Sequence, residues 1–209
     1  MNALIDAALF SIQPQNVVQK NFSLKENILT IQDKTFDLKN FNRVFLIGFG
    51  KGSAGLSKSI ENILGDLLTE GYVIDLQPEQ FAKIKFTTGT HPLPSNENLM
   101  FTKRVIDKLK SLTQKDLVLI IIAGGGSALF ENPYRISLKK LIEVNKSLLL
   151  SGATITEMNI VRKHLSMVKG GGLIKPLYPA VIVSVIASDV PGNDLSVIAS
   201  GPTVKDDTT

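Results

Sequence analysis

A seven-residue apolar run limits what this chain can fold into more than any other stretch of its sequence. Leu117–Ala123 contains only Leu, Val, Ile and Ala, and Gly124, Gly125, Gly126 and Ser127 follow it directly. Such a run is typical of a strand buried on both faces of a parallel sheet. The glycines predict a sharp turn whose amide groups can bind phosphate, especially if Ser127 opens a helix. A tight turn without a ligand is the alternative.

A second glycine-rich turn follows another predicted buried strand, Arg43–Ile47, and precedes a helical pattern. The turn, Gly48–Ala54, lacks the first glycine of a Walker A loop and the Ser or Thr that follows its lysine. It matches the Rossmann dinucleotide fingerprint only in part, because Ser53 stands where Gly or Ala is required. The sequence still predicts Gly50 and Lys51 at the mouth of the sheet among free amide groups, where Lys51 contacts phosphate or is simply solvated.

Strand and helix patterns alternate along the rest of the chain. We expect strands over Tyr72–Asp75, Ile84–Thr87 and Ala180–Ala187, a hairpin within Ile28–Leu38, and helices over Asn2–Ile12, Ser95–Leu112 and Ser137–Leu150, with another starting at the capping-box sequence Thr154–Glu157. This order predicts an α/β fold with an open, mostly parallel, Rossmann-like sheet and helices on both faces. We expect residues 1–209 to form a single domain.

Composition argues against several classes of protein. The 209 residues include no cysteine, which excludes disulfide scaffolds and thiolate metal sites. The net charge is +4, but lysines are scattered and tryptophan is absent, so we expect no nucleic-acid partner. No apolar segment reaches membrane-spanning length and the N-terminus lacks a basic signal-peptide region. The sequence therefore favours a soluble, cytoplasmic protein without a membrane partner.

Polar candidates follow the last predicted strand and sit on a later helix. Asp189 comes just after that strand and Asp194 follows in the same loop. Either could hold magnesium or take a proton from an acceptor hydroxyl, and a turn-capping role is the alternative. Asn159 and Arg162 share one side of a predicted helix, where Arg162 could recognise a small carboxylate or simply be exposed. His91 is interpreted as an ordinary loop histidine, with a site residue as the alternative, and no zinc site is expected.

The motifs in order resemble those of the class II glycerate kinases, whose C-terminal half is called the MOFRL domain. The most specific stretches are Gly152–Ser166, Ser188–Gly192 and Ile198–Thr203. The resemblance implies ATP-dependent phosphorylation of D-glycerate to 2-phosphoglycerate with Mg²⁺. It also implies an active site in the cleft between two domains, of which this chain is the first and lacks the C-terminal MOFRL domain. Some relatives carry the name hydroxypyruvate reductase.

The resemblance assigns roles to the candidate residues. Gly124, Gly125, Gly126 and Ser127, with Gly50, would hold nucleotide phosphates, and Lys51 would neutralise the transferred group. Asp189 would bind Mg²⁺, with Asp194, or act as base, and Arg162 with Asn159 would orient the D-glycerate carboxylate. There are departures, since Ala123, Gly172 and Asn193 stand where many members carry Ser, Arg and Asp.

Two other functions stay open on the sequence. One is a non-catalytic lone domain, retained or truncated, that binds an anion or a nucleotide without turnover. For either interpretation we expect a homodimer or a missing C-terminal domain. The other, less favoured, is a nicotinamide-dependent hydroxypyruvate reductase, with Asp75 at the distance where a ribose-binding acid would fall.

Overall fold

A five-stranded parallel sheet forms the centre of the protein in the computed structural model, which describes residues 2–208. Its strands, in spatial order, are β6 (Ile84–Thr88), β5 (Glu70–Asp75), β4 (Arg43–Phe49), β7 (Asp116–Ile122) and β8 (Val181–Ile186). All four pairings are parallel. The predicted α/β fold with an open parallel sheet is therefore confirmed, and every residue of β7 is buried, as its apolar sequence predicts.

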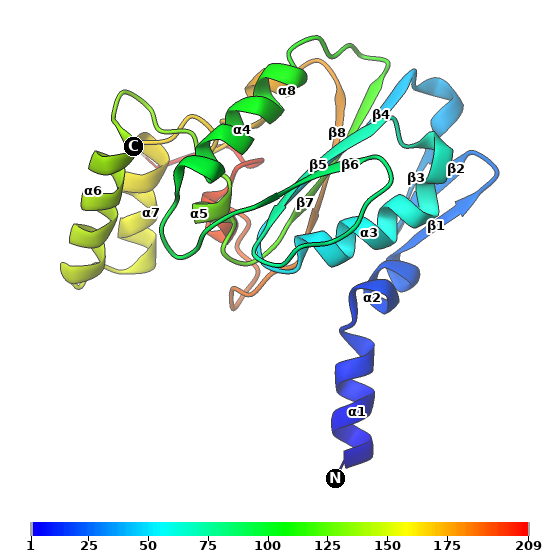
Figure 1. Ribbon diagram of the computed structural model, residues 1–209, viewed down its shortest axis with the longest axis horizontal. Helices are drawn as coiled ribbons and strands as arrows, with labels where there is room; N and C mark the ends of the chain where they lie inside the picture. The colour runs from blue at the N-terminus through cyan, green and yellow to red at the C-terminus, as the bar shows by residue number, and fades with distance from the viewer. Residues whose placement is uncertain (1, 209) are drawn as a thin grey trace.

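Helices cover both faces of this sheet (Figure 1). One face packs against α2 (Pro14–Asn21), α3 (Ser53–Leu64) and a small antiparallel sheet of β1 (Phe22–Lys25), β2 (Ile28–Ile31) and β3 (Lys34–Asp37). The other face packs against α4 (Asn96–Lys108), the single turn α5 (Gly126–Leu129) and α8 (Ile174–Leu177). Three 3-10 turns, Leu38–Asn40, Gly65–Leu67 and Ile198–Ser200, complete the connections.

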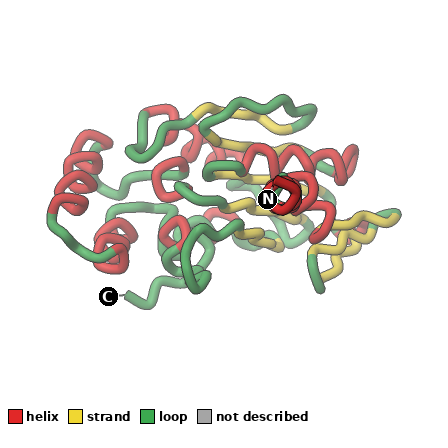
Figure 2. Tube along the Cα trace, turned by 90° about the horizontal axis from the view of Figure 1, so that it is seen from below, coloured by secondary structure: helices red, strands yellow, loops and turns green. Residues whose placement is uncertain are grey.

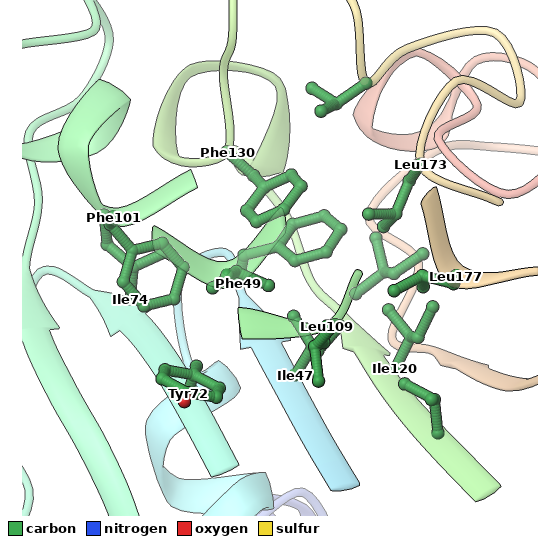
Figure 3. Close-up of a cluster of buried hydrophobic side chains, with 14 of the residues drawn as sticks. Ile47, Phe49, Tyr72, Ile74, Phe101, Leu109, Ile120, Phe130, Leu173 and Leu177 are labelled. Atoms are coloured by element: carbon green, nitrogen blue, oxygen red, sulfur yellow. The ribbon is translucent and has the colours of Figure 1, made fainter. Parts of the chain in front are cut away.

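The strands divide their side chains between two apolar cores with the period of two that a strand imposes. In β7, Leu119 and Ile121 belong to the core under α3, whereas Ile120 points into the core under α4. Figure 3 shows this second core, in which Phe49 and Phe130 stack with ring centroids 4.4 Å apart. This packing joins the end of β4 to the segment that follows the glycine loop.

Two helices form a separate projection at the end of the molecule opposite the small sheet. They are α6 (Leu138–Leu150) and α7 (Ile155–His164), which lie side by side in both views (Figures 1 and 2). The predicted capping box is confirmed, because Thr154 and Glu157 bond to each other's backbone at the start of α7. The C-terminal turn Ile198–Ser200 contacts both α5 and α7, and it thus links this projection to the sheet.

Several boundaries differ from the sequence-based predictions. The predicted hairpin gains a third strand, β1, and α4 ends at Lys108 rather than near Leu112. The strand β8 is only partly buried because it is the edge of the sheet. The predicted N-terminal helix exists as α1 (Asn2–Ser11), but it extends away from the body (Figure 1) and exposes 61% of Phe10. Within residues 2–208, the helices are too short or too polar to cross a membrane.

The order of the strands determines which edge of the sheet is suited to bind a ligand. Successive strands run outward from β4 through β5 to β6, and then the chain returns to β7 on the other side of β4. The carboxyl ends of β4 and β7 therefore form a topological switch point, where open α/β sheets bind their ligands. Both glycine-rich turns begin at this point.

Candidate functional site at the carboxyl ends of β4 and β7

The two glycine-rich turns are in direct contact at this edge. The backbone N–H of Lys51 donates a hydrogen bond to the carbonyl oxygen of Gly124 at 2.7 Å. Gly50 has φ +111°, and a Cβ atom on it would stand 2.3 Å from the carbonyl oxygen of Ala123. Only glycine fits this close approach. The exposed side chain of Lys51 is therefore held beside the loop that follows β7.

The amides of Lys51–Ala54 in the first turn are not free, which corrects the prediction of free amide groups around Lys51. Buried Asp75 accepts hydrogen bonds on Oδ2 from the N–H groups of Gly52 and Ala54, both at 2.9 Å. The N–H of Ser53 bonds to the carbonyl of Gly50. A carboxylate of the protein thus occupies the N-terminus of α3, where a bound pyrophosphate would sit in a dinucleotide fold.

The second turn keeps its amides available. Within residues 2–208, the N–H groups of Gly124, Gly125 and Ser127 donate to no protein acceptor. The helix predicted at Ser127 begins at Gly126 and is a single turn, so the loop itself rather than a long helix dipole supplies the donors. Gly125 has φ +77°, which a residue with a side chain rarely adopts. The loop is therefore the part of this edge able to bind an anion through its backbone.

Asp189 lies against this loop from the end of β8. Its Oδ2 is 2.2 Å from the point where a Cβ atom on Gly124 would stand, so only glycine leaves room for the carboxylate. A bare carboxylate here repels phosphate, and a bridging cation would remove that repulsion. No group of three or more His, Cys, Asp or Glu able to hold a metal occurs in the described part of the chain. The single carboxylate of Asp189 is compatible with Mg²⁺, because this ion takes one or two carboxylates together with phosphate oxygens and water.

Asp194, the second predicted metal ligand, is exposed and turned into its own loop. Its Oδ1 accepts a hydrogen bond from the backbone N–H of Ser196 at 2.8 Å. Hydrogen bonding by Ser196 lowers the pKa of Asp194 below the usual aspartate value. The side chain of Asp194 therefore caps the turn that follows β8.

A pocket of about 170 Å³ opens beside the glycine loop. Its polar lining comes from five separate segments: His91, Ser127, Glu131, Asn145, Arg162 and Lys169. Arg162 donates from Nε to Asn145 Oδ1 at 3.0 Å and forms no ion pair within residues 2–208. Burial lowers the pKa of Arg162, although the charge of Glu131 opposes that shift. A half-buried guanidinium with free donors favours an anionic ligand in this pocket.

A buried ion pair forms the floor of the pocket. Lys169 pairs with Glu131, and both side chains are less than 5% exposed. The other carboxylate oxygen of Glu131 accepts a hydrogen bond from the Ser166 hydroxyl at 2.6 Å. Because Glu131 neutralises Lys169, the positive charge that faces the pocket is chiefly that of Arg162.

The chain matches a known family along its whole length. The family model described as a domain of unknown function (DUF4147) covers residues 1–209. The chain belongs to the DUF4147 family. A protein named glycerate 2-kinase from Pyrococcus horikoshii is 39% identical to it over 212 residues, which are 99% of this chain and 46% of that protein. A protein from Agrobacterium vitis named putative hydroxypyruvate reductase is 41% identical over 170 residues, 80% of this chain and 44% of that protein.

A solved structure has the same fold as this DUF4147 chain. The crystal structure of a Pyrococcus horikoshii OT3 protein superposes with a TM-score of 0.91 at 37% identity, over 99% of this chain and 47% of that one. The chain thus spans about half the length of the relatives it matches.

The structure separates the two residues predicted to bind a carboxylate. Arg162 lines the pocket, whereas Asn159 is buried behind it and accepts a hydrogen bond from the Ser200 hydroxyl at 3.1 Å. The Ser200 hydroxyl in turn lies 2.8 Å from the hydroxyl of Ser127. In this DUF4147 chain, Asn159 thus reaches the pocket only through Ser200 and Ser127, and it fixes their hydroxyls.

Sequence reasoning missed four residues that line the pocket: His91, Glu131, Asn145 and Lys169. The only available signal for Lys169 was its position before the glycines at 170–172. His91 lies in the loop before α4, and its ring packs against Gly125, a contact between segments more than 30 residues apart. Nothing in the local sequence of the DUF4147 chain indicates that contact.

Proposed function

We propose that this DUF4147 chain provides the first half of an active site that phosphorylates D-glycerate with ATP to give 2-phosphoglycerate. The observation that carries the proposal is a juxtaposition at one edge of the sheet. Lys51, the glycine loop and Asp189 lie together there, beside a pocket in which Arg162 has no acidic partner among the described residues. A phosphate-binding loop next to a carboxylate-binding pocket suits transfer of a phosphoryl group to a hydroxy acid.

The glycine loop and Lys51 bind the nucleotide phosphates in this proposal. Gly124, Gly125 and Ser127 offer N–H donors without protein acceptors in residues 2–208, and Gly126 keeps the backbone close to the core. Lys51 is fixed to Gly124 through its backbone, and its ammonium group neutralises the charge of the transferred phosphoryl group. Gly50 allows this contact, and its own N–H donates to no protein acceptor in residues 2–208.

Asp189 is the residue that would hold Mg²⁺ on the phosphates. Bound by Asp189, the ion would supply charge neutralisation for phosphoryl transfer. Asp189 contacts the loop at Gly124, so its carboxylate would otherwise repel those oxygens. Asp194 is committed to the turn at Ser196, so we assign it no part in metal binding.

The pocket lined by Arg162 is the acceptor site. Its volume of about 170 Å³ accommodates a small hydroxy acid, and the guanidinium of Arg162 matches a carboxylate. Asn145 fixes the guanidinium from one side. Asn159 acts as a positioning residue, because it holds the Ser200 and Ser127 hydroxyls at the border between the pocket and the loop.

The active site would be completed by a second domain, such as the MOFRL domain that the sequence resemblance implies, or by a second copy of the chain. The crevice at β4 and β7 is open in this domain, and Lys51, His91 and Asp189 remain exposed. Phosphoryl transfer needs water to be excluded and the acceptor to be held in line.

One observation disfavours the hydroxypyruvate reductase alternative. Asp75 fills the N-terminus of α3 and bonds to Gly52 and Ala54, so this end of the helix has no vacancy for a dinucleotide pyrophosphate. Its carboxylate is buried and is not available to a ribose hydroxyl. Experiment distinguishes the non-catalytic alternative from half of a kinase active site.

The experiment follows backbone and side-chain NMR signals of the 209-residue chain during ligand titration. Mg·ATP is expected to shift the amide signals of the glycine loop, and D-glycerate is expected to shift the Arg162 side-chain signals. NADH is expected to shift neither set. Binding of NADH without binding of Mg·ATP would overturn the proposal. In a form with both halves, ³¹P NMR of the product tests whether phosphate is on the 2-hydroxyl.

A further inference from the structure

We propose that His91 recognises the acceptor hydroxyl: its unprotonated ring nitrogen accepts a hydrogen bond from the 2-hydroxyl of the acid. This inference rests on the proposed function, because it places a residue between the phosphate loop and the acceptor pocket assigned above. It makes His91 the residue that discriminates a 2-hydroxy acid from an acid without that hydroxyl.

The position of the ring is the first reason. A Cβ atom on Gly125 would stand 2.8 Å from Cδ2 and 3.0 Å from Nε2 of His91. The same point is 3.1 Å from Cε of Lys51. The imidazole therefore packs on the phosphate loop beside the lysine, and it also lines the pocket that contains Arg162.

The chemistry of the substrate is the second reason. In a 2-hydroxy acid, the hydroxyl is on the carbon next to the carboxylate. With the carboxylate at Arg162 and the phosphoryl group at Gly125 and Lys51, that hydroxyl must lie at the border between the two sites. His91 and Ser127 both line the pocket beside the loop. The Ser127 hydroxyl is held 2.8 Å from the Ser200 hydroxyl, toward Asn159, whereas the imidazole of His91 packs on Gly125 next to Lys51.

The state of the ring is the third reason. Within residues 2–208, His91 forms no hydrogen bond through its ring, so the unprotonated nitrogen is an unused acceptor at the pocket. Partial burial and the charge of Lys51 lower the pKa of His91, against an opposing effect of Asp189.

The charged groups that line the acceptor pocket with His91 are Glu131, Arg162 and Lys169, of which Glu131 and Lys169 pair with each other. With its pKa lowered, the imidazole is neutral at pH 7.5, and one nitrogen keeps the lone pair that a hydroxyl donor needs.

The test compares two acids on the 209-residue chain at pH 7.5. D-glycerate has the 2-hydroxyl, and 3-hydroxypropionate has the same carboxylate and 3-hydroxyl without it. We expect D-glycerate to bind about five- to tenfold more tightly, which is the usual worth of one such hydrogen bond. H91A should remove this difference and leave the affinity for 3-hydroxypropionate within about twofold. H164A is the control, because His164 bonds to Ile160 on the exposed side of α7 and should change neither affinity.

A second readout separates recognition from a structural role. In ¹⁵N NMR, the unprotonated nitrogen of His91 should shift with D-glycerate and stay unchanged with 3-hydroxypropionate. Equal binding of the two acids by the wild-type chain, or an equal loss of both in H91A, would overturn the role of His91. Absence of binding of both acids, or unchanged binding of both in R162A, would instead overturn the acceptor site itself.

Discussion

A backbone hydrogen bond holds Lys51 in place, because its N–H donates to the carbonyl oxygen of Gly124 at 2.7 Å. A substitution there should therefore remove the charge without moving the loop. We expect Lys51→Ala, in a form with both halves of the active site, to lower kcat by roughly a hundredfold or more. That corresponds to about 3 kcal/mol of transition-state stabilisation, with a smaller effect on the KM for D-glycerate. A coupled assay of ADP production measures both constants, and a kcat near that of the wild type would reduce Lys51 to a surface charge.

Gly125 offers a matched comparison for the phosphate loop. Its φ of +77° is close to the +73° of Gly152, but only Gly125 would place a Cβ atom against His91 and Lys51, since nothing lies within 4 Å at Gly152. Valine strains the backbone at both positions. We expect Gly125→Val to abolish nucleotide binding and Gly152→Val to leave it within about twofold, as measured by calorimetry with Mg·ATP. Undiminished binding by folded Gly125→Val would rule the loop out as the phosphate site.

At the scale of elements, one ion pair aligns the starts of β4 and β7. Arg43 donates from two nitrogens to the two carboxylate oxygens of Asp116, both at 2.8 Å, and the N–H of Thr113 bonds to the same carboxylate. The side chain of Asp116 is 1% exposed, whereas that of Arg43 is 37% exposed. The register of the two strands that carry the site therefore depends on a buried carboxylate at their opposite end.

Asp116→Asn should destabilise the protein in a pH-dependent way. We expect a loss of about 1.5–3 kcal/mol of unfolding free energy at pH 7, which is the range for hydrogen bonds to charged groups. The hydrogen bond from Arg43 holds the pKa of Asp116 below its ordinary value of 3.8. The stabilisation is thus present above pH 3.8 and is lost as the pH falls through the lowered pKa. Urea unfolding at pH 7 and pH 3 checks this, and an equal difference between wild type and variant at both values would contradict it.

The elements that the sequence predicts well are those with strong local patterns. The strand β7 follows from the apolar run that begins at Leu117, and the start of α7 follows from Thr154 and Glu157. The strand β1 was missed because Phe22–Lys25 is short and alternates with polar residues, so its pairing with β2 decides its conformation. The exposed side of β8 could not be predicted, since an apolar sequence does not say whether a strand is central or at the edge.

The candidate site likewise contains contacts that the sequence predicts and contacts that it does not. The meeting of Lys51 with the glycine loop follows from parallel strand order, because both turns leave the carboxyl ends of strands. The capping of α3 by Asp75 and the contact of His91 with Gly125 depend on tertiary packing between distant segments. No periodicity or local motif encodes such contacts, and only the folded structure reveals them.

For the whole molecule, the open crevice has a consequence for activity. If the proposed half-site needs an opposite wall, this domain alone would neither exclude water nor hold an acceptor hydroxyl in line with a phosphoryl group. Positioning of reactants is worth about 7–11 kcal/mol. We therefore expect the purified 209-residue chain to bind anions weakly and to show no measurable glycerate kinase activity. A coupled assay for ADP with D-glycerate measures this, and robust turnover would show that the chain or its homodimer forms a complete site.

The nature of the ligand at the β4–β7 edge is best established by calorimetric titration of the wild-type chain with Mg·ATP and, separately, with NADH. We expect saturable heat with Mg·ATP, because the amides of Gly124, Gly125 and Ser127 are available to phosphate. We expect no heat of binding with NADH, because Asp75 occupies the N-terminus of α3. Binding of NADH by the folded chain, or no binding of Mg·ATP, would contradict a nucleotide-phosphate site at this edge of the sheet.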